Sequence, residues 1–150
     1  MAALLAQFDI LPPTHAADSL VFESTKLTLY RQSTTQPLLF EVELARTPEQ
    51  QKQGLMFRDK VPTGTGMFFS FPSPKPVTFW MKNTRVPLDM LFVASDGIIN
   101  QISANAKPYD LTPLSSRKPV TGVLEIGGGE AKRLGIVIGD RIHVQKGAHP

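Results

Sequence analysis

The chain has 150 residues and a net charge of +3, and 41% of its residues are hydrophobic. A chain of this length forms one domain and buries about two-thirds of the surface that its unfolded form exposes. Because the sequence has no cysteine, disulfides, thiolate catalysis and cysteine-ligated metal sites are excluded. Basic residues never occur three in a row, so the charge pattern predicts no nucleic-acid-binding face.

The two ends of the chain are predicted to lie outside the folded domain. Residues 2–6 resemble the apolar part of an export signal and 14–17 its cleavage site, although Asp9 interrupts the signal and no basic residue precedes it. No stretch approaches the ~20 apolar residues of a membrane span. The leader favours an exported, periplasmic bacterial protein, with a cytoplasmic location as the alternative. We expect a leader or signal remnant at 1–19, a single β domain at 20–146 and a tail at 147–150.

The first part of the domain predicts a hairpin and a short helix. Hydrophobic residues alternate with polar ones over 26–30 and 40–44, as in half-buried strands, and the polar residues between them favour a turn. Thr47 is suited to cap a helix, and Gln50 completes a capping box. Gly54 stands where a left-handed residue ends a helix, so the helix has about two turns.

The middle of the chain predicts two strands on either side of a turn. The apolar run 67–71 is followed by prolines that exclude an internal sheet strand there: Pro72, Pro74 and Pro76. Residues 77–82 and 88–93 are strand-like, and the turn-like residues between them favour a hairpin.

The last third contains a second hairpin signal, Asp96-Gly97, and the longest irregular stretch, residues 105–119. The remaining predicted elements are strands at 98–102, 120–126 and 141–144 and a helical turn at 130–134 that is closed by Gly135. About eight short strands and two short helices indicate a mainly β, single-domain fold that resembles a sandwich or a barrel.

The only tryptophan lies in the predicted strand 77–82. Side chains of a strand alternate between its faces, so Trp80 and Lys82 share one face while Phe79 and Met81 share the other. In a hairpin with the strand that follows, Asp89 lies either beside Lys82 or on the apolar face, and a shift of one residue exchanges the two outcomes.

These residues form the candidate site. Tryptophan and arginine commonly anchor binding surfaces, and the predicted ligand-binding residues are Arg58, Trp80, Lys82, Asn83 and Asp89. Asp89 alone has two other interpretations, a structural tether within the fold or a catalytic base. No other residue is predicted to be catalytic.

Metal and cofactor sites are not predicted. His15, His143 and His149 are too scattered to share an ion, and no acidic calcium loop occurs. The glycines 127–129 precede a helical turn, but no Lys-Ser or Lys-Thr follows, so they indicate a turn rather than a phosphate loop.

Several longer runs resemble the domain-of-unknown-function family one-nine-two over about residues 37–145. They are Gly54–Arg58, Gly66–Phe69, Phe79–Thr84, Pro87–Phe92, Val123–Glu125, and the late segments Leu134–Ile136 and Gly139–Arg141. The resemblance implies a small prokaryotic protein with a β-sandwich-like fold, often exported. Because the biochemical role of that family is uncharacterised, the resemblance assigns no catalytic residues.

Three functions are consistent with the sequence. The first is a non-enzymatic binding module that holds a small polar ligand or a partner segment at the Trp80, Lys82 and Arg58 surface. The second is a small hydrolase or lyase with Asp89 as its base, and the third is a structural or assembly protein. The residues favour the first, because no second titrating group accompanies Asp89.

Overall fold

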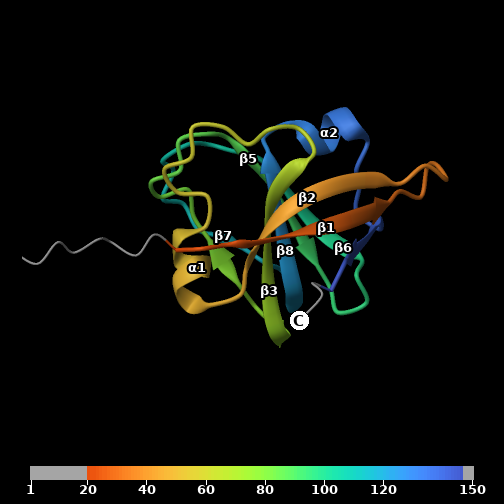
Figure 1. Cartoon of the computed structure of the whole chain (residues 1–150), viewed down its shortest axis with the longest axis horizontal. Coiled ribbons are helices and arrows are strands. Elements are labelled where there is room, and N and C mark those ends of the chain that lie inside the picture. Colours follow the sequence, from red (N-terminus) through yellow and green to blue (C-terminus); the bar gives the residue numbers. More distant parts are fainter. Residues whose placement is uncertain (1–19, 147–150) are drawn as a thin grey trace, which may run out of the picture.

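The computed structural model describes residues 20–146, which form nine strands and two short helices (Figure 1). In chain order these are β1 (Glu23–Tyr30), β2 (Leu38–Ala45), α1 (Pro48–Gln53), β3 (Thr65–Lys75), β4 (Thr78–Phe79), β5 (Leu88–Val93), β6 (Ile99–Ala106), β7 (Leu114–Ser115), β8 (Val120–Gly127), α2 (Glu130–Leu134) and β9 (Arg141–Val144). The mainly β fold with two short helices is confirmed. Neither helix within 20–146 has the length and apolar character needed to cross a membrane. The predicted leader, 1–19, and tail, 147–150, lie outside the described residues.

Seven strands form one curled half-barrel sheet in the order β6–β5–β8–β3–β2–β1–β9, and β4 pairs with β7 in a separate small sheet. Strands β2 and β3 are parallel, and the other pairs of the large sheet are antiparallel. A parallel pair needs a crossover connection, and α1 lies within it. A bridge between Ile98, just before β6, and Arg141 of β9 shows that the sheet curls until its two edges meet at one end.

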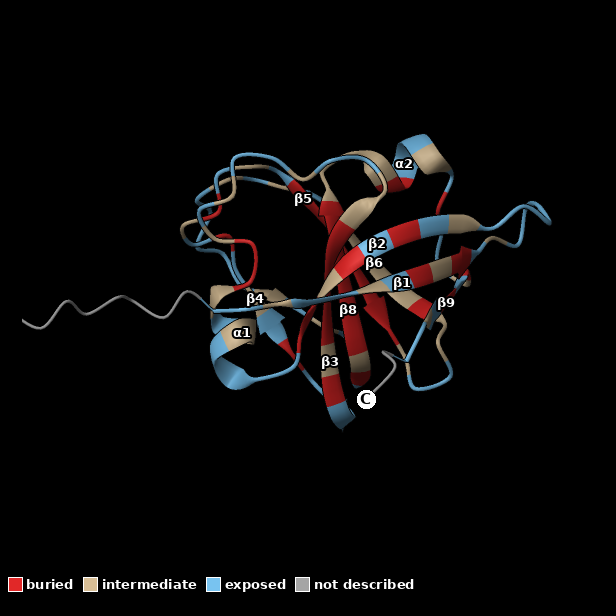
Figure 2. Ribbon diagram, in the orientation of Figure 1, coloured by how far each residue is buried: buried red, intermediate tan, exposed pale blue. Residues whose placement is uncertain are grey.

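The centre of the sheet is buried on both faces (Figure 2). Every residue of β5 is buried, and successive residues belong to different cores. Leu91 packs in one core with Ala131 of α2. Met90 and Phe92 pack in the other, against which Phe79 of β4 lies. The two faces of β5 and β8 therefore look onto different parts of the molecule, α2 on one side and the small sheet on the other.

Predictions that rest on local signals are confirmed. β1 and β2 form an antiparallel pair, and the Asp96-Gly97 turn joins β5 to β6 with a φ of 83° at Gly97. Both bonds of the capping box are present, because the Thr47 side chain accepts from the Gln50 N–H and the Gln50 side chain accepts from the Thr47 N–H. Gly135 ends α2 in the left-handed conformation.

The prolines after residue 71 exclude an internal sheet strand, as predicted, but they do not end β3. β3 continues to Lys75, which pairs with Val120 of β8. The pairing is irregular between Ser70 and Lys75, and β2 pairs with β3 only as far as Phe69. The prolines thus occupy an irregular stretch with a free side, which is where a strand tolerates a residue without an N–H.

The predicted hairpin between residues 77–82 and 88–93 does not form. β4 spans only Thr78 and Phe79, and it pairs with β7 from the stretch predicted to be irregular. β5 pairs with β6 and β8, and Asp89 stands opposite Ile126. Neither of the two registers considered for Asp89 therefore occurs. The alternation within the segment is correct, since Val77 and Met81 are buried whereas Thr78, Trp80 and Lys82 are exposed.

Candidate functional site

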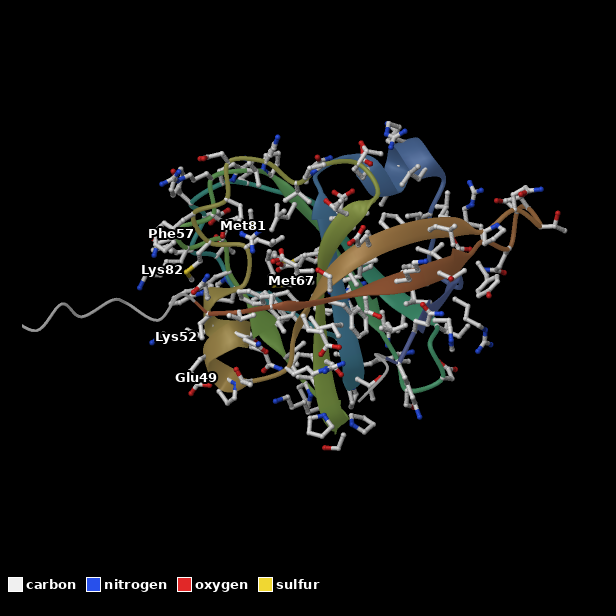
Figure 3. All side chains as sticks on the ribbon, in the orientation of Figure 1. Glu49, Lys52, Phe57, Met67, Met81 and Lys82 are labelled. Atoms are coloured by element: carbon white, nitrogen blue, oxygen red, sulfur yellow. The ribbon has the colours of Figure 1, made fainter. Side chains whose placement is uncertain are left out.

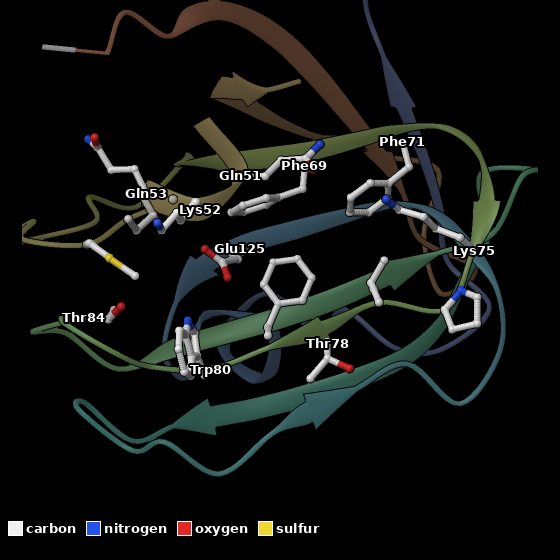
Figure 4. A pocket seen from close by; sticks show the side chains of 16 residues that line it. Gln51, Lys52, Gln53, Phe69, Phe71, Lys75, Thr78, Trp80, Thr84 and Glu125 are labelled. Carbon is white, nitrogen blue, oxygen red and sulfur yellow. The ribbon is translucent and has the colours of Figure 1, made fainter. Parts of the chain in front are cut away.

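A cleft of about 480 Å³ opens between α1, the far half of β3 and β4 (Figure 4). Its walls include the rings of Phe69, Phe71, Phe79 and Trp80. Lys52 of α1 and Lys75 of β3 are its basic residues, and Glu125 of β8 is its single acidic residue. We call this space the aromatic cleft.

Helix α1 is held in place as one wall of the aromatic cleft. Its six residues bury no side chain, so packing alone does not fix it. The capping box orders its start, and the Gln51 side chain donates to the carbonyl oxygen of Ser70 on β3 at 3.0 Å. At its end, Gly54 has a φ of 48°, and a Cβ there would lie 3.1 Å from the Phe69 ring. A residue without a side chain therefore lets the helix end close against the sheet.

Glu125 lies at the base of the aromatic cleft (Figure 4). It stands between Met67 of β3 and Met90 of β5 in the sheet, and only 4% of its surface is exposed. None of the hydrogen bonds or ion pairs found within 20–146 involves its carboxyl group. Burial raises the pKa of the Glu125 carboxyl from 4.5 to about 8, because an apolar setting disfavours the charged form. The group is therefore mostly protonated at neutral pH.

Trp80 stands at the mouth of the aromatic cleft and is 49% exposed. The Nζ atom of Lys82 lies 5.1 Å from the centre of its ring, and Lys75 Nζ lies 4.8 Å from the centre of the Phe71 ring. Both distances are in the range of cation–π contacts, worth about 0.5–1 kcal/mol at exposed sites. Aromatic faces around the cleft thus already attract ammonium groups of the protein itself.

A second groove of about 360 Å³ lies on the other side of Trp80 and Lys82 and includes Phe57 and Asn83. Figure 3 shows Phe57 and Lys82 at the same end of the molecule as Lys52 of α1. The Phe57 N–H donates to the Asn83 carbonyl oxygen at 2.9 Å. Both residues have positive φ, 64° and 54°, which is uncommon for a side chain as large as phenylalanine. We call this space the Phe57 groove.

Arg58 lies in neither space. It forms an ion pair with Glu43 at 2.9 Å and lines a smaller groove of about 240 Å³ beside β2. Leu55 lines both this groove and the aromatic cleft.

Asp89 lies on the opposite face of the sheet from Glu125 and has no exposed surface. Its carboxylate accepts three backbone N–H groups, from Asn105 at 2.8 Å, Gly129 at 3.0 Å and Ala131 at 2.8 Å. Two of these donors belong to the start of α2. Asp89 therefore ties α2 and β6 to β5, and it lines none of the spaces described above.

The structure thus brings together three of the five predicted residues, Trp80, Lys82 and Asn83, and places Arg58 and Asp89 elsewhere. Glu125 was not predicted. The signal was present in the strand 120–126, where a single acidic residue interrupts an otherwise apolar run. A charge at an inward position of a buried strand is costly unless it is paired or neutral, so it marks a residue that needs an explanation.

The arrangement can bind a small molecule by apolar contact with aromatic rings and by a polar contact at the base. It offers no multidentate metal site, because no group of three or more His, Cys, Asp or Glu side chains occurs within 20–146. A single carboxyl is a poor ligand set for calcium, which takes six to eight oxygens.

Known proteins place this chain in a family. A crystal structure from Sinorhizobium meliloti 1021, of a protein provisionally described as a transcription regulator, is 43% identical with a TM-score of 0.81, over 84% of this chain and 97% of that one. A protein of unknown function from Novosphingobium aromaticivorans DSM 12444 is 42% identical with a TM-score of 0.76, over 90% and 94%. No curated protein matches. The profile of the DUF192 family, described as an uncharacterized ACR, matches residues 30–144, and the chain therefore belongs to the DUF192 family.

Proposed function

We propose that this protein is a non-enzymatic binding module that holds a small polar ligand in the aromatic cleft. The observation that carries the proposal is the cleft itself, which combines about 480 Å³ of space with aromatic walls and a buried carboxyl group at its base. Small-molecule sites are mostly apolar cavities of this size range with a few polar groups that fix orientation. Trp80 is the predicted residue that contacts the ligand there, and Lys82 lies above its ring.

The chain carries its own reporter for this proposal. Trp80 is the only tryptophan, and it stands half-exposed at the mouth of the cleft. We expect its fluorescence to shift in intensity or wavelength when one of a panel of small polar compounds binds. The panel contains monosaccharides, amino acids, short amines and short carboxylic acids at millimolar concentrations.

Two variants of α1 distinguish the aromatic cleft from its neighbour. Gln53 lines both spaces and Glu49 lines only the Phe57 groove. Gln53→Phe narrows both spaces and is expected to weaken the fluorescence response, whereas Glu49→Phe on the same helix narrows the Phe57 groove alone and leaves the response unchanged. A response lost in Glu49→Phe would instead place the ligand in the Phe57 groove. No response of Trp80 to any member of the panel would overturn the proposal.

A small hydrolase or lyase is the second candidate, and one observation favours it. A carboxyl whose pKa is raised to about 8 is protonated at neutral pH, so it can donate a proton to a leaving group. Glu125 would hold this role, because Asp89 has no exposed surface and its oxygens already accept three backbone N–H groups. Hydrolysis of p-nitrophenyl acetate that is lost in Glu125→Gln would favour this candidate.

A further inference from the structure

We propose that the ligand of the aromatic cleft carries an ammonium group and that Glu125 binds this group at the base of the cleft. This inference rests on the proposed binding function and adds the chemical class of the ligand. It follows from three features of the described residues: a carboxyl without a partner, walls made of aromatic rings, and the separation of charges between the base and the rest of the cleft.

The carboxyl of Glu125 has unused bonding capacity. A carboxylate offers about four acceptor sites, and buried polar groups in folded proteins are nearly always hydrogen-bonded. Asp89 follows that rule with three donors. Glu125 keeps 4% of its surface exposed, on the side of the cleft, and its carboxyl has no hydrogen-bond partner within the described part of the chain. Its place in the cleft lining shows that a ligand can reach the side chain. A donor group on the ligand would satisfy it.

The walls favour a cationic donor over a neutral one. The face of an aromatic ring attracts cations, and Lys75 and Lys82 already place their ammonium groups over Phe71 and Trp80. Phe69 and Phe79 meet edge to face with ring centres 4.9 Å apart, and both line the same cleft. A ligand ammonium at the base would therefore lie among rings and next to a carboxylate.

The charges in the cleft are arranged to orient such a ligand. The basic residues of the lining, Lys52 and Lys75, are exposed, and the acidic residue is buried. Above pH 8, where Glu125 is ionised, an anion placed at the base would meet a like charge at close range, which is unfavourable in an apolar setting. An ammonium at the base meets an opposite charge, and any acidic group on the same ligand would lie toward the lysines.

Binding of an ammonium group to Glu125 must be linked to protons. The free carboxyl is mostly protonated below its pKa of about 8, and an ammonium neighbour stabilises the ionised form, so a proton is released on binding. Met67 of β3 and Met90 of β5 stand opposite Glu125 in the sheet, and Phe79 and Trp80 of the β4 segment line the same cleft. None of these four side chains carries an ionisable group. Lys52 and Lys75 are the other charged groups of the lining.

The test compares three probes of equal length in the full chain: hexylamine, 1-hexanol and hexanoate. Trp80 fluorescence gives the affinity of each. At pH 8 and above, we expect hexylamine to bind about tenfold or more tightly than 1-hexanol, since hydrogen bonds to charged groups are among the strong ones, and hexanoate to bind least. The affinity for hexylamine should rise up to tenfold per pH unit below pH 8 and level off above it, while that for 1-hexanol stays constant.

Variants then assign the effect to one carboxyl. Glu125→Gln should weaken hexylamine about tenfold and remove its pH dependence while changing 1-hexanol by less than twofold. Glu49→Gln, an acidic residue that lines only the Phe57 groove, serves as the control and should change neither probe. If Glu125→Gln does not fold, the comparison of the three probes in the unaltered chain still tests the inference.

The outcomes separate this inference from the function on which it rests. If 1-hexanol or hexanoate binds as tightly as hexylamine at every pH, the cleft remains a binding site but the ammonium class is wrong. If Glu49→Gln rather than Glu125→Gln weakens hexylamine, the amine lies in the Phe57 groove and the inference is overturned. If none of the three probes nor any compound of the panel changes Trp80 fluorescence, both the function and the ligand class fail.

Discussion

Two buried carboxyl groups on opposite faces of the same sheet have opposite surroundings. Asp89 of β5 accepts three backbone N–H groups within 3.0 Å, which satisfies an ionised carboxylate. Glu125 of β8 has methionines as its cross-strand neighbours, and its pKa is raised to about 8 by burial alone. The first residue therefore contributes to the fold, and the second is the group left free for chemistry.

The role of Asp89 can be tested by removing its charge alone. Asp89→Asn replaces one acceptor oxygen by an amide group that faces N–H donors, so at least one buried donor loses its partner. We expect the free energy of unfolding to fall by about 1–3 kcal/mol while the Trp80 response to ligands in the folded protein is unchanged. Urea denaturation provides the measurement.

A matched control exists for this substitution at the exposed turn between β5 and β6. Asp96 also accepts a backbone N–H, from Ile98 at 3.0 Å, but from a solvated position. Asp96→Asn should change the free energy of unfolding by about 0.5 kcal/mol or less. Equal effects of the two substitutions would refute the tethering role of Asp89.

At the residue scale, the sequence predicted which side chains share a face of a segment better than it predicted which residues lie in contact. Trp80 and Lys82 were assigned to one face of their segment by alternation, and the structure agrees. The position of Asp89 was left open between two registers, and both assumed a hairpin that does not form. Glu125 was missed because periodicity identifies a buried strand without showing that one of its side chains faces a cleft.

At the scale of elements, the small sheet of β4 and β7 is attached to the large one chiefly through Phe79. Its ring meets Phe69 at 4.9 Å and Phe92 at 6.3 Å between ring centres, in both cases edge to face. Each strand of the small sheet has only two residues, too few to be stable without support. The wall of the aromatic cleft that carries Trp80 therefore depends on Phe79 together with Val77 and Leu114, which pack in the same core.

Phe79→Ala should loosen this wall. Loss of a half-buried aromatic side chain is expected to lower the free energy of unfolding by about 2 kcal/mol. Amide hydrogen exchange at Val77 and Ser116, whose N–H groups bond across the small sheet, should accelerate more than exchange in β5 or β8, because the small sheet would open locally. Thr78→Ala, one residue earlier and on the exposed side, removes only an exposed hydroxyl hydrogen bond to Ser115 and should change both quantities much less. A uniform acceleration over all strands would contradict local opening.

Elements were predictable where their signals are local. The capping box of α1, the Asp96-Gly97 turn and the left-handed Gly135 each depend on residues a few positions apart, and each is confirmed. The pairing of β4 with β7 joins Thr78 to Ser115. These residues are far apart in sequence, and no single tight turn connects their strands. Pairings of that kind depend on packing against the large sheet, which no short window of sequence contains.

At the scale of the whole molecule, Glu125 makes stability depend on pH in an unusual direction. Its pKa is about 8 in the folded chain and near 4.5 when exposed. Below pH 4.5 both states are protonated and the residue carries no penalty. Between pH 4.5 and 8 the unfolded chain releases the proton and the folded chain keeps it. The contribution of Glu125 to the free energy of unfolding therefore falls by up to about 1.4 kcal/mol per pH unit in this range and is constant above pH 8.

Glu125→Gln isolates this contribution, because glutamine has nearly the same shape and does not titrate. The other carboxyl groups contribute equally to the stability of both proteins, so their contributions cancel in the difference. Glu130 is one of them, and its hydrogen bond with Arg133 lowers its pKa. We expect the two proteins to have similar free energies of unfolding near pH 4.5 and the variant to be more stable by several kcal/mol near pH 8. Urea titrations at a series of pH values measure the gap.

The shape of that difference curve decides how the molecule keeps a carboxyl in its interior. A gap that widens steadily from pH 4.5 to 8 means that the folded chain holds Glu125 neutral and that the cleft is a dry, apolar space until a ligand arrives. A gap that stays constant means that water entering the cleft keeps Glu125 ionised at an ordinary pKa, in which case ammonium binding would show no proton release. The stability measurement without ligand and the proton linkage of binding thus depend on the same group, and they must agree.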